Sequence, residues 1–289
     1  MKKNSRLELS EIAIIKEQGK VVCVRSMNFI YPICSSSKGN AIYAGTKESG
    51  ILFDCGIGIR SLTSALKLND ISLSAIRAVF ITHEHSDHIK GLYKLSDTIP
   101  VAIYGNVATL KELIAKNAIG SKAKLKEINK KPAIVENMEL SSFRTSHDSV
   151  DSMGYRLTFD DGKRFALSTD LGYVSEEVDR QISESDFVFI ESNYDEKMLL
   201  NGSYPWFLKQ RIQGERGHLS NCDCAEEIHK LVSRGVKHFM LGHLSEENNR
   251  PEIALETSVS RLVSDGMKIN SDFTLSVAPR MTIGKVVEL

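Results

Sequence analysis

The amino-acid sequence predicts an α/β protein folded as a four-layer αββα sandwich, with a site along one edge of its sheets. Two β-rich halves follow each other along the 289 residues, and helical patterns flank both halves. Because ligands in open α/β sheets bind at the carboxyl ends of strands, polar residues at those ends are expected to meet at one edge. Such residues follow five apolar runs: Asp54, His83, Asp170, Glu191 and His243.

The first half alternates short apolar strands with amphipathic helices. Residues 1–26 are expected to be an N-terminal extension with a strand pattern at 20–25, and residues 27–289 to form one domain. Gly39 is expected to supply a positive φ in a turn-rich segment, and the lysine-rich segment 122–131 to be a connector. Strands are predicted at 27–31, 41–44, 50–54, 78–82 and 101–104, and helices at 59–68, 89–95 and 107–119, the last with Gly120 as its C-cap.

The second half repeats the alternation. Asp160-Asp161-Gly162 predicts a hairpin, and Gly235 is expected to end a helix. Cys222-Asp223-Cys224 is interpreted as the start of that helix, because one short cysteine pair is weak evidence for a metal. Strands are predicted at 138–143, 154–159, 164–168, 187–190, 236–241 and 273–277, and helices at 175–182, 221–234 and 251–264.

Composition narrows the class of protein. Lys plus Arg and Asp plus Glu balance at 37 each, so no global charge field favours nucleic acid, although a local basic patch is compatible with it. Five scattered cysteines indicate reduced thiols rather than a disulfide frame. No run approaches the roughly 18 apolar residues of a membrane span, and the polar N-terminus lacks a signal peptide core. A cytoplasmic protein without an obligate protein partner is expected.

The segment Thr82-His83-Glu84-His85-Ser86-Asp87-His88 predicts a metal site. Imidazole and carboxylate are ligands that Zn²⁺ and similar ions prefer, and alternate spacing lets two rings converge on one ion. A His-rich polar turn is the alternative, but the position after a strand favours a site. A structural zinc site is disfavoured, because such sites are closed and rich in cysteine.

These motifs resemble the metallo-β-lactamase-fold hydrolases. His83-x-His85-x-Asp87-His88 is preceded by Asp54 and followed by His147, Asp170 and His243, in the family's order and across nearly all of residues 27–289. The resemblance implies this fold for a single catalytic domain with two divalent ions, Zn or Mn. It implies that His83, His85 and His147 hold one ion, that Asp87, His88 and His243 hold the other, and that Asp170 bridges both. Asp54 would orient a ligand histidine by hydrogen bonding.

Three further segments resemble the YycJ (WalJ) subfamily, whose members are regarded as 5′-to-3′ DNA exonucleases. They are Ser35–Asn40, Glu191–Asp195 and the run from His218 to Asn221, with Ser36 in place of the usual Gly and Tyr194 in place of His. The resemblance implies a phosphodiesterase that uses a metal-bridging hydroxide, with DNA favoured over RNA. Catalytic roles then fall to Asp87 and Asp170. The segment around His218 also resembles tRNase Z, and that resemblance implies Glu191 and His218 as candidates for proton transfer or phosphate contact. For His218 the alternative is a helix-entry residue whose ring satisfies a backbone group.

Substrate binding leaves several readings open. Phosphate contacts are expected from four cations near the site motifs, each of which would otherwise be solvated surface: Lys209, Arg211, Arg216 and Arg250. The Ser35–Asn40 loop would present backbone N–H groups to a phosphate or, alternatively, form a tight supporting turn. A small-molecule ester or phosphodiester hydrolase, an RNA-processing nuclease and a non-hydrolytic metal-binding module are the alternatives. Native metal, polarity and oligomeric state are left open.

Overall fold

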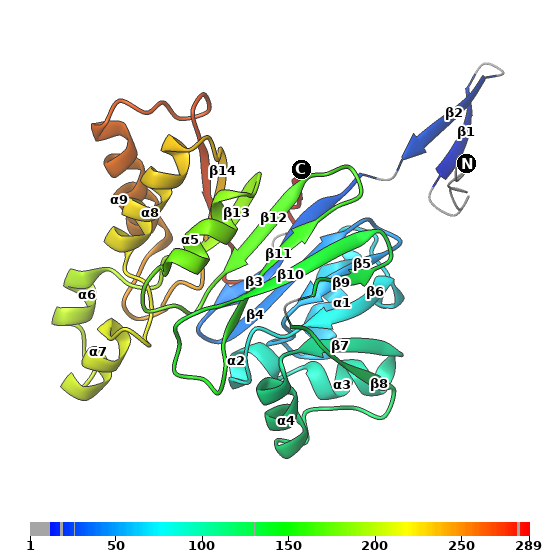
Figure 1. The fold of residues 1–289 in the computed structure, drawn as a ribbon, viewed down its shortest axis with the longest axis horizontal. Helices are drawn as coiled ribbons and strands as arrows, with labels where there is room; N and C mark the ends of the chain where they lie inside the picture. The colour runs from blue at the N-terminus through cyan, green and yellow to red at the C-terminus, as the bar shows by residue number, and fades with distance from the viewer. Residues whose placement is uncertain (1–11, 18–19, 26, 130, 282–283) are drawn as a thin grey trace.

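Two seven-stranded β-sheets pack face to face, with helices covering both outer sides (Figure 1). The computed structural model describes residues 12–17, 20–25, 27–129, 131–281 and 284–289. This arrangement confirms the predicted αββα sandwich. Within the described part of the chain, no helix is both long enough and apolar enough to cross a membrane.

The first sheet is built mainly from the first half of the chain and has the order β16-β3-β4-β5-β6-β7-β8. Strands β5 to β8 run parallel to one another, so their carboxyl ends lie at one edge. Its strands are β3 (Phe29–Ser36), β4 (Gly39–Gly45), β5 (Gly50–Phe53), β6 (Ile76–Phe80), β7 (Val101–Gly105), β8 (Ala123–Glu127) and β16 (Val287–Glu288). The helical segments of this half are α1 (Ile59–Lys67), η2 (Leu73–Ala75), α2 (Ser86–Ile89), α3 (Leu92–Thr98) and α4 (Val107–Ala115).

The second sheet has the order β15-β14-β13-β12-β11-β10-β9, and its strands β12 to β15 are parallel. Its strands are β9 (Ala133–Val135), β10 (Met138–Arg144), β11 (Met153–Thr158), β12 (Arg164–Ser168), β13 (Phe187–Glu191), β14 (His238–Gly242) and β15 (Thr274–Val277). The helices of this half are α5 (Glu176–Ser183), α6 (Glu196–Asn201), α7 (Trp206–Gln213), α8 (Asn221–Ser233) and α9 (Pro251–Ser264).

Three apolar clusters hold the layers together. Side chains such as Phe53 and Phe80 from one sheet meet Tyr155 and Phe165 from the other. A second cluster joins the first sheet to α1, α3 and α4, and a third joins the second sheet to α5, α8 and α9. Burial of these faces is the main driving force for the layered arrangement.

Local sequence signals set several helix boundaries. The Ser220 hydroxyl accepts a hydrogen bond from the Asp223 N–H at 3.0 Å, and Gly235 follows the helix with a φ of 98°. Gly235 ends α8 and the cysteine pair lies in its first turn, as the sequence predicts, while the Ser220 cap is seen only in the structure. Asn106 caps α4 in the same way, and its amide also donates to the Asp151 carbonyl.

Some predicted local features are wrong. Gly39 does not have a positive φ; a Cβ there would instead meet the Ile57 side chain at 2.8 Å. The helix that begins at Val107 ends at Ala115, so Gly120 is not its C-cap. The predicted lysine connector contains the edge strand β8, whose lysines suit an edge that must not pair with another chain.

Two more segments differ from the predicted boundaries. The strand expected at 27–31 is β3, which runs on through Ser36, and the helix expected at 89–95 is divided into α2 and α3. Strand β2 (Lys20–Arg25) confirms the strand pattern in the extension, and it pairs with β1 (Ile12–Glu17) in a separate two-stranded sheet. Residues 1–11, 18–19 and 26 of that extension lie outside the described residues, and a domain boundary at residue 26 stays a prediction.

Candidate metal centre

Three of the predicted site residues lie at bends that directly follow parallel strands. Asp54 follows β5, Asp170 follows β12 and His243 follows β14, and their φ angles are 57°, 57° and 54°. Left-handed backbone is unfavourable for side chains with a Cβ, so it persists where surrounding structure enforces it, and it concentrates at functional sites. The bends turn all three side chains into the space between the two sheet edges.

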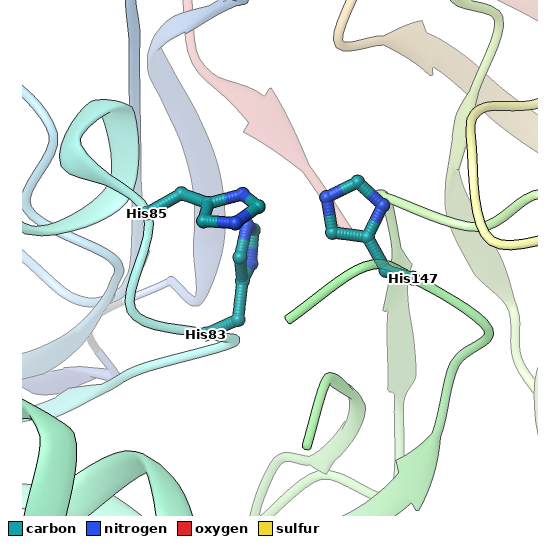
Figure 2. A group of neighbouring side chains, drawn as sticks. All are labelled: His83, His85 and His147. Carbon is teal, nitrogen blue, oxygen red and sulfur yellow. The ribbon is translucent and has the colours of Figure 1, made fainter. Parts of the chain in front are cut away.

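One group of imidazoles comes from two distant segments. His83 and His85 lie after β6, and His147 lies on the loop after β10; Figure 2 shows the three rings facing one another. The ring centroids of His83 and His147 are 5.0 Å apart, and those of His85 and His147 are 5.1 Å apart. One nitrogen from each ring lies within 4.8 Å of the others, which is a spacing that lets them share one cation.

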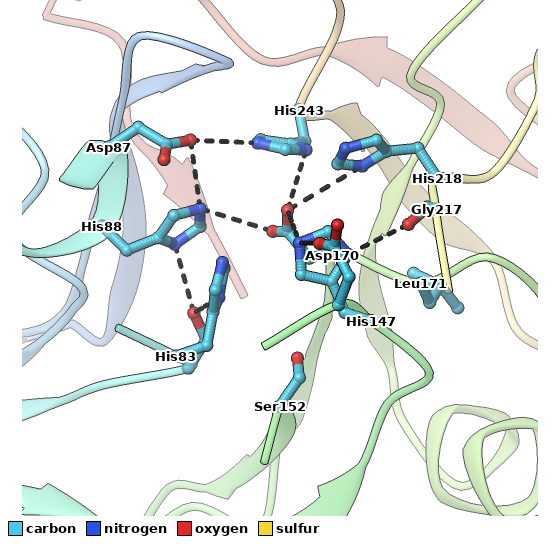
Figure 3. Close-up of polar contacts among 12 residues, drawn as sticks. His83, Asp87, His88, His147, Ser152, Asp170, Leu171, Gly217, His218 and His243 are labelled. Atoms are coloured by element: carbon cyan, nitrogen blue, oxygen red, sulfur yellow. Dashed lines mark hydrogen bonds and ion pairs between the residues drawn. The ribbon is translucent and has the colours of Figure 1, made fainter. Parts of the chain in front are cut away.

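A second group combines Asp87, His88 and His243, whose ligand atoms also lie within 4.8 Å of one another. Asp170 lies between the two groups (Figure 3). Its Oδ1 is 3.6 Å from His147 Nε2, and its Oδ2 is 3.4 Å from His88 Nε2. The structure therefore brings together all seven residues that the resemblance implies as ligands, with Asp170 in the bridging position.

Asp54 is buried beneath the second group and fixes its geometry. One carboxylate oxygen accepts from the Thr82 N–H at 2.8 Å, and the other lies 2.7 Å from His88 Nδ1. With Nδ1 donating its proton to Asp54, His88 presents Nε2 toward Asp87 and Asp170. The contact matches the orienting role that the sequence predicts for Asp54.

Glu191 performs a similar task for two rings at once. Its Oε1 lies 2.8 Å from His218 Nδ1 and 2.7 Å from His243 Nδ1. Its Oε2 accepts from the N–H groups of Leu171 and Leu219. Glu191 is completely buried and both of its carboxylate oxygens accept these hydrogen bonds, which places it behind the two imidazoles that it orients. Its part in proton transfer or phosphate contact stays a prediction.

The electrostatics divide the imidazoles into two kinds. Burial lowers the pKa of His83 and of His147, which favours the neutral ring that a cation ligand must offer. Burial also disfavours the charged form of His243, but Asp170, Asp87 and Glu191 outweigh it and raise the pKa of His243 to about 10. His88 has a raised pKa for the same reason, with Asp54 as its strongest carboxylate neighbour.

The donor set fits divalent cations. Three buried ligand atoms lack a hydrogen-bond partner among the described residues: His83 Nε2, Asp170 Oδ2 and His243 Nε2. The last two have only ion-pair neighbours, with Asp170 Oδ2 at 3.4 Å from His88 Nε2 and His243 Nε2 at 3.6 Å from Asp87 Oδ2. Unpaired buried polar atoms are costly, which makes a cation the natural partner. Imidazole and carboxylate donors without cysteine suit Zn²⁺ or Mn²⁺.

Sequence reasoning missed several residues that support the ligands. The Asn40 amide nitrogen lies 3.1 Å from His88 Nε2, and the Ser35 hydroxyl accepts from the His243 N–H at 2.8 Å. Buried Glu84, which lies between His83 and His85 in the sequence, accepts a hydrogen bond from the Val150 N–H. This bond connects the loop that carries His147 to the segment 82–88. These partners are 40 or more positions apart in sequence, so no local spacing reveals them. Ser35 and Asn40 thus support the site with their side chains.

A hollow of about 190 Å³ opens beside the centre. His218 lines it together with Asp148 from the His147 loop, Ser37 from the β3–β4 turn, and Arg211 from α7. Arg211 is thus well placed to meet a phosphate, although its Nε also lies 2.5 Å from Asp148 Oδ2.

The other predicted phosphate contacts are occupied elsewhere. Lys209 is buried, and its ammonium donates to the carbonyls of Leu200 and Gly202, so a phosphate contact is contradicted. Arg216 donates to the carbonyl of His147, which holds that ligand loop in place. The Arg250 guanidinium donates to the Asn249 carbonyl at the start of α9. Of these four cations, Arg211 alone lines the hollow.

The fold and the paired ligand groups define a class of metal-dependent hydrolases. A family model described as the Beta-lactamase superfamily domain matches residues 50–244, a range that holds all seven ligand candidates. The metallo-β-lactamase fold protein YhfI of Bacillus subtilis superposes with a TM-score of 0.68 at 16% identity, covering 91% of this chain and 99% of that one. The chain belongs to the metallo-β-lactamase superfamily.

Two relatives place the chain in a narrower family within this superfamily. Exodeoxyribonuclease WalJ of Streptococcus pneumoniae serotype 2 is 37% identical over 251 residues, which cover 86% of this chain and 93% of that protein. Exodeoxyribonuclease YycJ of Bacillus anthracis is 34% identical over 236 residues, which cover 81% and 88% of the two chains. Because the similarity extends over most of both chains, this chain belongs to the family of the exodeoxyribonucleases WalJ and YycJ. This confirms the family that the sequence motifs indicate.

Proposed function

We propose that this chain is a phosphodiesterase that holds two divalent ions and removes nucleotides from DNA, from the 5′ end. The observation that carries the proposal is the pair of ligand groups joined by Asp170. The substrate follows from the family, since both relatives are named exodeoxyribonucleases. When bound, two such ions supply Lewis-acid charge to the attacking and leaving oxygens of a phosphodiester.

The side chains of this chain contribute binding, orientation and proton transfer. Asp170 presents one oxygen to each ligand group, and Asp54 and Glu191 fix which nitrogens of His88 and His243 face that space. His218 is 22% exposed and lines the hollow. With Nδ1 donating to Glu191, its Nε2 is free to carry a proton to or from the reacting phosphate. Arg211 binds a neighbouring phosphate.

Hydrolysis of end-labelled DNA tests the proposal. Wild-type protein with Zn²⁺ or Mn²⁺ should release mononucleotides from a 5′-phosphorylated strand, while the 3′ label is retained until late in the reaction. D170N keeps the side-chain size and tolerates the positive φ, because Asn adopts left-handed backbone readily. We expect at least a hundredfold loss of turnover with the fold intact. DNA left whole by the wild-type protein with either metal contradicts the function, and preferential cleavage of RNA or of a small ester reassigns the substrate.

Release of the 3′ label first would reverse the polarity while leaving the metal chemistry in place. The control substitution is D161N, in the exposed β11–β12 hairpin and outside the ligand groups. It should retain wild-type turnover. A comparable loss in D161N and D170N would show that the assay reports general damage rather than loss of the bridging carboxylate.

A further inference from the structure

Two adjacent aromatic side chains at the start of α7 stand in solvent. Trp206 is 63% exposed and Phe207 is 71% exposed. Scattered exposed apolar residues are ordinary, but neighbouring exposed aromatic rings on a helix that lines a functional hollow mark an interaction surface. Figure 1 shows α6 and α7 as two short helices that project from the body of the sandwich. We call Trp206 and Phe207 the aromatic pair.

The aromatic pair lies on the same helix as three residues that line the hollow beside His218. Leu208, Arg211 and Ile212 of the same helix line that hollow. Phe207 is four residues before Arg211, so the two side chains are neighbours on the helix surface. A chain molecule that places one phosphate against Arg211 would therefore carry its next groups past Phe207 and Trp206.

The aromatic pair is also held firmly relative to the metal centre. The buried Lys209 ammonium bonds the carbonyls of Leu200 and Gly202 at 2.7 Å each, which clamps α7 to the end of α6. Arg211 Nε lies 2.5 Å from Asp148 Oδ2, and Asp148 directly follows the ligand candidate His147. A rigid mount of this kind lets a ring bind a substrate group at a fixed distance from the reacting bond.

We propose that the aromatic pair binds unpaired bases of the DNA substrate by stacking; this rests on the proposed function. Aromatic side chains beside a cationic group form the usual platform for single strands, because every base offers a π-face. A base-paired duplex hides those faces except at its ends. A protein partner fits less well, since each ring buries about 150–250 Å², and a stable interface needs about 800 Å² from each partner.

Because the aromatic pair stacks only on exposed bases, the enzyme should prefer DNA with a frayed or single-stranded end. It also makes binding insensitive to base sequence, because stacking reads the ring face rather than its hydrogen-bonding edge. The pair acts on affinity for nucleic acid and leaves the chemistry at the metal centre unchanged.

Fluorescence provides a direct test, because Trp206 is the single tryptophan of the chain. The metal-loaded protein is titrated with a twelve-residue oligothymidylate and with an abasic strand of equal length, both with phosphorothioate linkages to slow hydrolysis. The thymidylate should quench Trp206, and the abasic strand should not. Because W206A/F207A has no tryptophan, the affinities of all variants are compared by the fluorescence anisotropy of 3′-fluorescein-labelled strands. The double variant should bind thymidylate 10- to 100-fold more weakly, with its affinity for the abasic strand within twofold of wild type.

Matched variants separate stacking from damage. W206Y/F207Y keeps two rings and should retain most of the affinity, and Y93A removes a ring that is 50% exposed on α3 and should change nothing. Hydrolysis of bis(p-nitrophenyl) phosphate, too small to span both sites, should be equal in all variants. Unchanged thymidylate affinity in W206A/F207A overturns the inference, as does equal quenching by the abasic strand.

Failure of the inference and failure of the proposed function are distinguishable. If the wild-type protein degrades DNA while W206A/F207A behaves identically, the aromatic pair has no role in binding and the function stands. If thymidylate quenches Trp206 but no nucleic acid is hydrolysed with Zn²⁺ or Mn²⁺, the function fails and the stacking surface stands. Quenching by phosphatidylglycerol vesicles at concentrations where thymidylate has no effect assigns the surface to a membrane and overturns the inference.

Discussion

Replacing Glu191 with Gln tests whether one buried carboxylate organises the site. The side chain accepts four hydrogen bonds, from the Nδ1 atoms of His218 and His243 through Oε1 and from the N–H groups of Leu171 and Leu219 through Oε2. Gln has almost the same shape, but one of its two polar ends is an NH₂ group that cannot accept. Whichever way the amide is turned, two N–H donors face another donor.

The magnitude follows from this count. An unpaired buried donor costs about 1–3 kcal/mol, so E191Q should lower the free energy of unfolding by about 2–6 kcal/mol. The His243 ring can avoid an unpaired donor by changing tautomer, so that Nδ1 accepts a hydrogen bond and Nε2 carries the proton. That tautomer blocks the nitrogen that faces Asp87, so metal affinity falls instead, by about 10–100-fold as for other residues that orient ligands.

Urea unfolding and metal titration are both measured, because the change of tautomer would reduce the loss of stability and increase the loss of metal affinity. E139Q on the exposed face of β10 is the control and should change neither quantity. If E191Q alters the free energy of unfolding by less than 0.5 kcal/mol, roughly the spread of neutral surface substitutions, and also keeps metal affinity within twofold, the assigned role of Glu191 is wrong.

Three further predictions concern the metal and pH. D54N should weaken metal binding by about 10–100-fold, because an amide nitrogen then faces the donors of Thr82 and His88; calorimetry with unchanged affinity argues against this. Because the pKa of His243 is raised to about 10, metal-free protein carries that proton at pH 8, and Zn²⁺ binding should release it; heats that do not depend on the buffer's ionisation enthalpy contradict this. Burial raises the pKa of Glu227 above its ordinary 4.5, so the unfolded chain loses this proton first and wild-type stability falls as pH rises through that interval. E227Q should abolish the fall, and an equal slope in urea titrations from pH 4 to 8 would count against it.

The sequence shows polar residues close after apolar runs because the relevant physics is local, whereas the assignment of seven residues as metal ligands came from the family resemblance and stays a prediction. Apolar runs mark buried strands, and a polar residue directly after such a run in a parallel sheet must lie at the site edge. His243 directly follows β14, and Asp170 and His83 lie two and three residues after the ends of β12 and β6. The layered fold follows from the same alternation, since each sheet needs helices on one face and the other sheet on its second face.

The missing parts depend on contacts between distant segments. Lys209 looks like a surface cation in sequence, and only the return of the chain past Leu200 and Gly202 gives its ammonium two buried carbonyl partners. Helices α6 and α7 are only 6 and 8 residues long, which is too short for a helical period to stand out in the sequence. The left-handed bends at Asp54 and Asp170 carry no glycine to signal them.

The origin of the ligands in both sheets has a consequence for how the protein assembles. His83, His85, Asp87 and His88 follow a strand of the first sheet, whereas His147, Asp170 and His243 follow strands of the second. Neither half alone offers a complete set of donors. Tight binding of a metal ion therefore requires that the two halves have docked. Metal binding would therefore stabilise the contact between the two halves, so that they unfold together. In a denaturant titration, metal release should coincide with unfolding of the whole sandwich rather than precede it.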